Sequence, residues 1–143
     1  MNNKLKYWFR WISVFPGAII AGILATFPLH WVLYFTLAHG ESISGVNIDP
    51  IEYFLYPFVI AIVYILAGYK IAPNYKFRTA IVLFVAYVLF WTTASIISLS
   101  NTNFFGYDLQ FSGRTILSLV GAIIGLYITK RLNNKIIQPH ELA

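Results

Sequence analysis

Residues 79–99, TAIVLFVAYVLFWTTASIISL, form an unbroken run without a charged side chain. An α-helix rises about 1.5 Å per residue and the hydrocarbon core of a bilayer is about 30 Å thick, so about 20 apolar residues cross it. This run therefore predicts a transmembrane helix. Similar runs occupy 16–38, 51–69 and 115–129, with Glu52 as their only Asp, Glu, Lys or Arg, and breaker-rich loops separate them. The last run is short and needs residues just before it, such as Arg114, to lie at or inside the outer membrane boundary.

The composition of the whole chain agrees with this interpretation. Of the 143 residues, 59% are hydrophobic and 10% are charged, whereas a soluble domain has about 25% charged residues. The mean hydropathy is +0.70. These values exclude a soluble enzyme, a disordered chain and a nucleic-acid-binding module. We predict an all-α membrane protein with a single transmembrane domain, an up-down antiparallel bundle of four helices at about 14–38, 51–70, 78–100 and 112–131.

The distribution of charge predicts the orientation of the chain. Nine of the ten Lys and Arg residues lie in segments 1–15, 70–78 and 130–143, and four of the five acidic residues lie in or beside the other two loops. Short loops rich in Lys and Arg stay in the cytoplasm. We therefore predict a multi-pass protein of the cell membrane with both termini cytoplasmic. The first apolar run is too long for a signal peptide, and no small-residue cleavage site follows it.

Small residues predict where the helices approach one another, because helices in lipid associate through small and polar side chains rather than through hydrophobicity. Gly17 and Gly22 lie in the first predicted helix. Gly121 and Gly125 form a GxxxG spacing in the fourth. We expect the first and fourth helices to pack closely and antiparallel through these glycines. The alternative is that Gly121 and Gly125 form a contact between two copies of the chain, which the motif alone does not distinguish.

Arg114 is the first candidate functional residue, because ionisable groups inside a membrane are costly to bury. It lies near the outer end of the fourth predicted helix, above the glycine face, and should point into the bundle. A guanidinium at that depth needs a partner, and Asp108 and Glu52 are the plausible carboxylates. The alternative is that the Arg114 side chain extends to the outer head groups.

His30 is the second candidate, at a similar depth in the first predicted helix. Pro28 lies just before it and removes a backbone donor, so a kink is expected near residues 24–28. We expect a neutral imidazole that bonds a freed carbonyl or a hydroxyl on a neighbouring helix, with a proton relay or a ligand contact as the alternative. Glu52 begins the second helix, where the helix dipole stabilises a carboxylate without any further function.

These polar groups predict a pocket in the outer half of the bundle that binds an anion or a lipid head group. The predicted ligand-binding residues are Arg114, His30, Tyr34, Tyr56, Ser95 and Glu52, with Tyr53, Thr92 and Ser98 nearby.

The chemistry of the chain otherwise favours a protein without enzymatic activity. Cysteine is absent, and there is no nucleophile-elbow, zinc-protease, P-loop or dinucleotide motif. We predict no metal and no cofactor. The leading hypothesis is a membrane subunit or partner-binding protein that contacts the lipid bilayer and either another membrane protein or copies of itself. The alternative is a small oligomeric transporter or channel protomer that uses the outer pocket. A lipid-modifying enzyme is the least favoured class.

Overall fold

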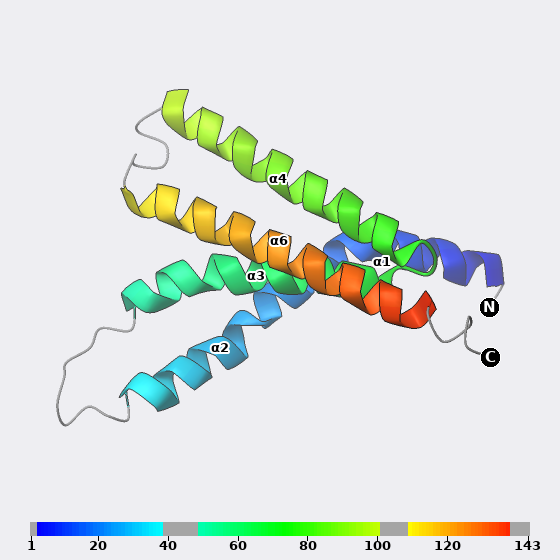
Figure 1. The fold of residues 1–143 in the computed structure, drawn as a ribbon, viewed down its shortest axis with the longest axis horizontal. Coiled ribbons are helices and arrows are strands. Elements are labelled where there is room, and N and C mark those ends of the chain that lie inside the picture. The colour runs from blue at the N-terminus through cyan, green and yellow to red at the C-terminus, as the bar shows by residue number, and fades with distance from the viewer. Residues whose placement is uncertain (1–2, 39–48, 101–108, 138–143) are drawn as a thin grey trace.

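The computed structural model describes residues 3–38, 49–100 and 109–137, and every element in these ranges is a helix. In chain order the elements are α1 (Asn3–Leu24), α2 (Thr26–Leu33), the π-helical turn η1 (Tyr34–Ala38), α3 (Asp49–Ile71), α4 (Lys76–Ser100) and α6 (Leu109–Ile137). Figure 1 shows α4, α6 and α3 running side by side, with the start of α1 and the end of α6 at the same end of the molecule.

Within the described ranges, four helical stretches are long and apolar enough to cross a membrane, with mean hydropathies between 1.5 and 2.2. They are Trp8–Thr36, Ile51–Ile71, Lys76–Ile97 and Gly113–Lys135. The all-helical fold with four such helices is thus confirmed. The terminal helices run further than predicted, since α1 already begins at Asn3 and α6 continues to Ile137. Lysine and arginine end the apolar runs there, and both are good helix formers.

The first apolar stretch is not one continuous α-helix. α1 ends at Leu24, Ala25 separates the two parts, and α2 begins at Thr26, inside the range where a kink was predicted. Pro28 explains the break, because it has no N–H to donate to the carbonyl four residues earlier, on Leu24, and its ring crowds that carbonyl. The Thr26 hydroxyl donates a 2.7 Å hydrogen bond to the carbonyl of Ile23 beside the break.

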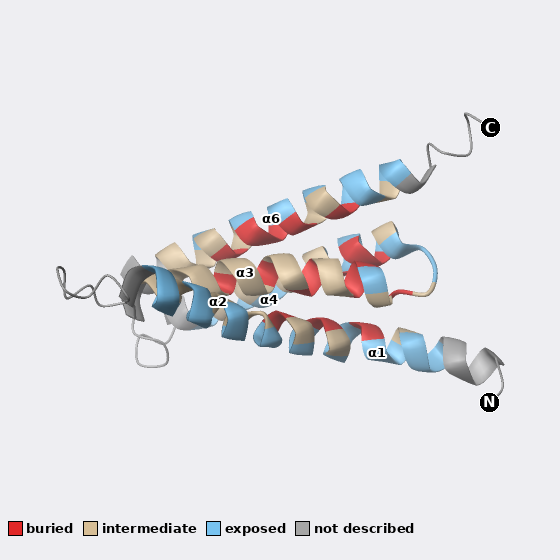
Figure 2. Ribbon diagram, turned by 90° about the horizontal axis from the view of Figure 1, so that it is seen from below, coloured by how far each residue is buried: buried red, intermediate tan, exposed pale blue. Residues whose placement is uncertain are grey.

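α3 is the central helix of the bundle. Both α1 and α6 pack along it, and α4 contacts α3 and α6. In Figure 2 the buried positions of α1 and of α6 face α3, which runs between them. Within the described residues, buried apolar side chains from all four long helices form the hydrophobic core. They are Val14 and Ala18 from α1, Ala61, Tyr64, Ile65 and Tyr69 from α3, Ala72 just after α3, Ala80 and Leu83 from α4, and Ala122 from α6.

The glycines of α6 lie against α3. A Cβ atom on Gly121 would meet the backbone of Phe58, at 3.1 Å from its Cα. A Cβ atom on Gly125 would lie 3.2 Å from the Cα of Ile62. The two glycines therefore allow the backbones of α3 and α6 to approach closely.

The glycines of α1 also lie against α3. A Cβ atom on Gly22 would lie 3.3 Å from the carbonyl oxygen of Ile60, and one on Gly17 would lie 2.9 Å from Cδ1 of Ile71. The prediction that the first and fourth helices pack against each other through their glycines was therefore wrong. α3 lies between them, and each glycine pair approaches a different side of it. A small residue permits close approach to any helix, so its position alone does not identify the neighbour.

The two ends of the bundle differ in their polar groups. We call them the Glu52 end, where α3 begins, and the Lys76 end, where α3 connects to α4.

Candidate functional site

The Glu52 carboxylate links α2 to α3 at the Glu52 end. Its Oε1 lies 2.6 Å from Nδ1 of His30, and its Oε2 accepts a 2.6 Å hydrogen bond from the hydroxyl of Tyr56, one turn further along α3. The Tyr56 hydroxyl also lies 3.4 Å from the His30 Nδ1. The Glu52 side chain is 13% exposed, whereas that of His30 is 50% exposed. Both carboxylate oxygens therefore have partners in the protein.

The imidazole of His30 has a partner that the sequence did not indicate. The prediction of a hydrogen bond to a freed carbonyl or a hydroxyl was incomplete, because the shorter contact of Nδ1 is to a carboxylate. In a contact with an ionised carboxylate, which only accepts hydrogen bonds, the imidazole donates from Nδ1. The ring of Tyr34 stacks near the imidazole, with 6.4 Å between the ring centroids. The neutral state of His30 stays a prediction.

Arg114 projects from α6 onto Tyr53, the residue after Glu52. Its Cζ lies 4.0 Å from the centroid of the Tyr53 ring, which is a cation–π contact. Its Nε is buried and has no hydrogen-bond partner among the described residues. The predicted ion pair with Glu52 is not found there, because that carboxylate is bonded to His30 and Tyr56. Asp108, the other predicted partner, lies outside the described residues.

The predicted pocket is only partly assembled. His30 and Tyr56 contact the carboxylate of Glu52, and the ring of Tyr34 lies near His30. Arg114 lies over the ring of Tyr53, the next residue after Glu52. The hydroxyl of Ser95 instead donates a 2.8 Å hydrogen bond to the carbonyl of Trp91 in its own helix. Thr92 likewise bonds to the carbonyl of Val88. The side chain of Ser98 lies outside the described residues.

A second polar contact, which sequence reasoning missed, joins α4 to α6. The hydroxyl groups of Tyr87 and Ser118 form a hydrogen bond, and Ser118 is fully buried. The Tyr87 ring also lies beside that of Tyr64 on α3, with 5.7 Å between the centroids. In the sequence, each hydroxyl lies on the helix face that carries small and polar residues, which indicated that both side chains could face a neighbouring helix. That they pair with each other depends on the rotation of both helices.

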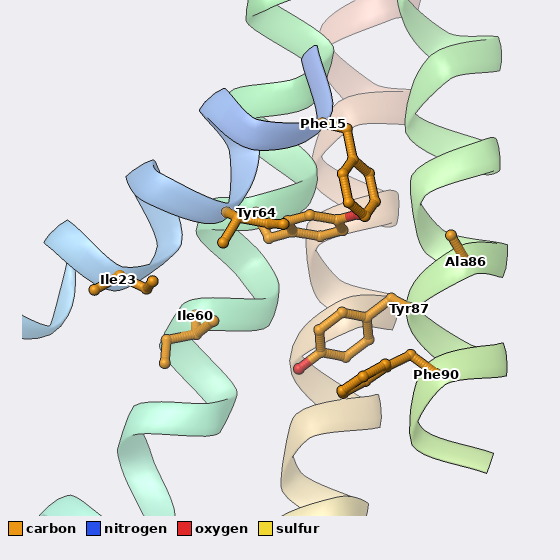
Figure 3. A pocket seen from close by; sticks show the side chains of 8 residues that line it. Phe15, Ile23, Ile60, Tyr64, Ala86, Tyr87 and Phe90 are labelled. Atoms are coloured by element: carbon orange, nitrogen blue, oxygen red, sulfur yellow. The ribbon is translucent and has the colours of Figure 1, made fainter. Parts of the chain in front are cut away.

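An apolar cavity of about 420 Å³ lies where α1 and α4 diverge, with α3 between them (Figure 3). α1 packs extensively along α3, and it does not pack in this way against α4 or α6. Four of the residues that line the cavity are exposed at its rim, and the other four are more deeply placed. The rim consists of Phe15, Ile19, Ile23 and Phe90, and the interior of Ile60, Tyr64, Ala86 and Tyr87. The cavity is therefore a groove that opens sideways from the bundle.

The described residues contain no group of three or more His, Cys, Asp or Glu side chains that could hold a metal ion. No protein-family model, curated protein or solved structure matches the chain. The described residues form four helices long and apolar enough to cross a membrane, which is compatible with a small membrane protein.

Proposed function

We propose that the chain is an integral membrane protein without enzymatic activity, which acts as a membrane subunit by binding a transmembrane helix of a partner protein. The observation that carries this proposal is the sideways-open groove between α1 and α4. In a closed four-helix bundle each helix packs against two neighbours around a shared core. Here α1 packs extensively only along α3. One flank of α1 therefore offers a place for a helix from another chain.

The hydroxyl of Tyr64 favours a protein occupant over a lipid acyl chain. The Tyr64 side chain is 5% exposed and lies across the groove toward Phe15 (Figure 3). Its hydroxyl is a polar group in the lining of an otherwise mostly apolar groove. Hydrocarbon offers no acceptor to such a hydroxyl, whereas a neighbouring helix offers polar side chains and, at a break, free carbonyl groups.

The α4 wall of the groove also suits a helix. Ala86 lines this wall, and small residues let helix backbones approach closely in lipid. Apart from Tyr64 and Tyr87, whose hydroxyl is already paired with Ser118, the lining side chains are apolar, so a helix with one polar residue among apolar ones would match the groove.

The test compares two substitutions on α4. Ala86→Trp fills the groove, whereas Val82→Trp adds the same side chain at a position that is 65% exposed and does not line it. The complex that contains the chain is extracted from its native membrane in mild detergent and sized on a native gel. We expect Ala86→Trp to release the chain from its partner and Val82→Trp to leave the complex intact. A wild-type chain that runs alone, bound only to lipid and detergent, would refute the proposal.

A second candidate function is a small oligomeric transporter or channel protomer with an anion or lipid head group bound at the Glu52 end. The Arg114 Nε supports it, because this group is buried without a hydrogen-bond partner among the described residues. In proteoliposomes, a symmetric homo-oligomer whose anion flux is lost in Arg114→Leu would favour this candidate. A complex with a different protein, unaffected by Arg114→Leu, would favour the subunit.

A further inference from the structure

An open pocket of about 470 Å³ with several polar side chains in its lining lies beside the connection between α3 and α4, at the Lys76 end. Its polar lining comes from α3, from the connection, from the first turn of α4 and from α6. These groups are Tyr69, Asn74, Tyr75, Lys76, Arg78 and Asn133. Three of the candidate membrane spans end or begin here, at Ile71, Lys76 and Lys135. The pocket therefore lies at the level of the lipid head groups if these helices cross a bilayer.

The hydroxyl of Tyr69 lacks a partner in this pocket. The Tyr69 side chain is 4% exposed, and its hydroxyl is buried without a hydrogen bond to any described residue. A buried polar group without a partner destabilises the fold, so native proteins usually supply one from the protein, from water or from a bound ligand. Because Tyr69 lines the pocket, a ligand with an acceptor oxygen would satisfy this hydroxyl.

Backbone amides add further donors at the same place. α4 begins at Lys76, and its first described helical hydrogen bond runs from the amide of Thr79 to the carbonyl of Tyr75, at 3.0 Å. The amides of residues 76–78 precede this bond and have no acceptor inside the helix. Unpaired amides and the positive end of the helix dipole both favour an anion at a helix N-terminus.

The charge around the pocket is positive and is not balanced within the described residues. Lys76 and Arg78 line it, and the Arg78 guanidinium lies over the ring of Tyr75, 5.3 Å from its centroid. The acidic residues in the described ranges are Asp49 and Glu52, both in the first turn of α3 at the opposite end of the bundle. An anion is thus the ligand whose charge this pocket complements.

We propose that this pocket binds a phosphate group, carried either by an anionic lipid head group or by a free phosphate. A tetrahedral phosphate presents several acceptor oxygens and can take hydrogen bonds from the Tyr69 hydroxyl, the amides at the start of α4 and the two cationic side chains at once. The site is distinct from the groove between α1 and α4 and shares no lining residue with it.

The experiment uses the full chain in a neutral detergent. Native mass spectrometry with equal amounts of phosphatidylglycerol and phosphatidylcholine measures lipid retention, and calorimetric titration with sodium phosphate measures binding of the free anion. We expect binding that Tyr69→Phe weakens about tenfold, as for the loss of one hydrogen bond to a charged group. Arg78→Gln should weaken it by a similar factor. Lys70→Gln is the matched control, because Lys70 is an exposed cation at the same end that does not line the pocket.

The outcomes separate the two sources of phosphate. Preference for phosphatidylglycerol without a response to sodium phosphate identifies a lipid head group, and a saturable response to sodium phosphate identifies the free anion. Thermal unfolding without ligand shows whether Tyr69→Phe is folded, and no loss of stability is expected, since the substitution removes an unpaired hydroxyl. Absence of binding to both probes would overturn the proposal, as would an equal loss in Lys70→Gln, which would indicate charge attraction without a site.

Discussion

The carboxylate of Glu52 and the imidazole of His30, 22 residues apart in the chain, meet at 2.6 Å. This contact links α2 to α3. It lies beyond the break at Ala25, where the chain has left α1. Tyr56 completes the arrangement by donating to the second carboxylate oxygen. One acidic side chain therefore adds two polar contacts to the packing of this part of the chain around the central helix.

Glu52→Ala should destabilise the protein by about 1–3 kcal/mol, because it leaves the Nδ1–H group of His30 and the hydroxyl of Tyr56 without their acceptor. Thermal unfolding in detergent measures this change. Thr92→Val is the control, since the Thr92 hydroxyl bonds only within its own helix, and it should change stability far less. Equal stability of Glu52→Ala and the wild type would show that the contact does not hold α2 in place.

The contact of Arg114 with Tyr53 depends on the aromatic ring and not on the phenol hydroxyl. Tyr53→Leu should therefore lose about 0.5–2 kcal/mol of coupling to Arg114, whereas Tyr53→Phe should keep most of it. A double-mutant cycle with Arg114→Met, followed by thermal unfolding, measures the coupling energy. Additive effects of Tyr53→Leu and Arg114→Met would contradict the prediction.

Gly121→Ala and Gly17→Ala should change stability in opposite directions. Alanine stabilises a helix interior by about 0.5–1 kcal/mol relative to glycine. At Gly121 the added Cβ atom meets the backbone of Phe58, so α3 and α6 must move apart, and overpacking of this kind is destabilising by about 1–3 kcal/mol. At Gly17 only the terminal carbon of Ile71 must move. Melting temperatures in detergent test the difference, and equal stabilisation by both substitutions would contradict the close approach at Gly121.

The hydrogen bond between Tyr87 and Ser118 should show a coupling energy of about 0.6 kcal/mol, and not more than about 1.7 kcal/mol, as for other hydrogen bonds between membrane helices. Tyr87→Phe leaves the Ser118 hydroxyl without its partner, and Ser118→Ala does the same to the Tyr87 hydroxyl. The double substitution should therefore be less destabilising than the sum of the single ones. Ser95→Ala is the control, because its hydroxyl bonds to a carbonyl in α4 itself. A coupling of zero would indicate that the two hydroxyls do not pair in the membrane.

The predicted orientation is tested by cysteine labelling, which is direct because the chain contains no cysteine. Thr36→Cys and Asn74→Cys lie at opposite ends of the bundle, and both native side chains are exposed. The basic segments predict that a membrane-impermeant maleimide added to intact cells labels Thr36→Cys, and that it labels Asn74→Cys only after permeabilisation. The reverse pattern would invert the orientation, and labelling of both from outside would contradict the predicted number of crossings between them.

The helices were predictable because long uncharged runs leave the backbone few ways to satisfy its polar groups in lipid. The break near Ala25 was also predictable, since Pro28 removes a donor wherever it lies in a helix. The ends of the helices were less predictable, because α1 and α6 continue beyond their apolar runs into residues that are still compatible with a helix. These features depend on local sequence alone.

The pairings between helices could not be predicted in the same way. Gly121 and Gly125 indicated a close approach but not that α3 was the neighbour, because small residues fit any helix. Glu52 was matched with Arg114 on grounds of charge, whereas the rotation of α2 and α3 brings it to His30. Rotation about a helix axis depends on the sum of many contacts, and a single sequence does not determine it.

The interruption at Ala25 has a consequence for how the molecule would fit bilayers of different thickness. A straight span responds to a thinner or thicker hydrocarbon layer by changing its tilt over its whole length. A span divided after Leu24 can change the inclination of its short second part alone, while α1 keeps its contacts along α3. Adjustment to hydrophobic mismatch would then be confined to α2 and its link through Glu52, and the packing of α3, α4 and α6 would stay the same.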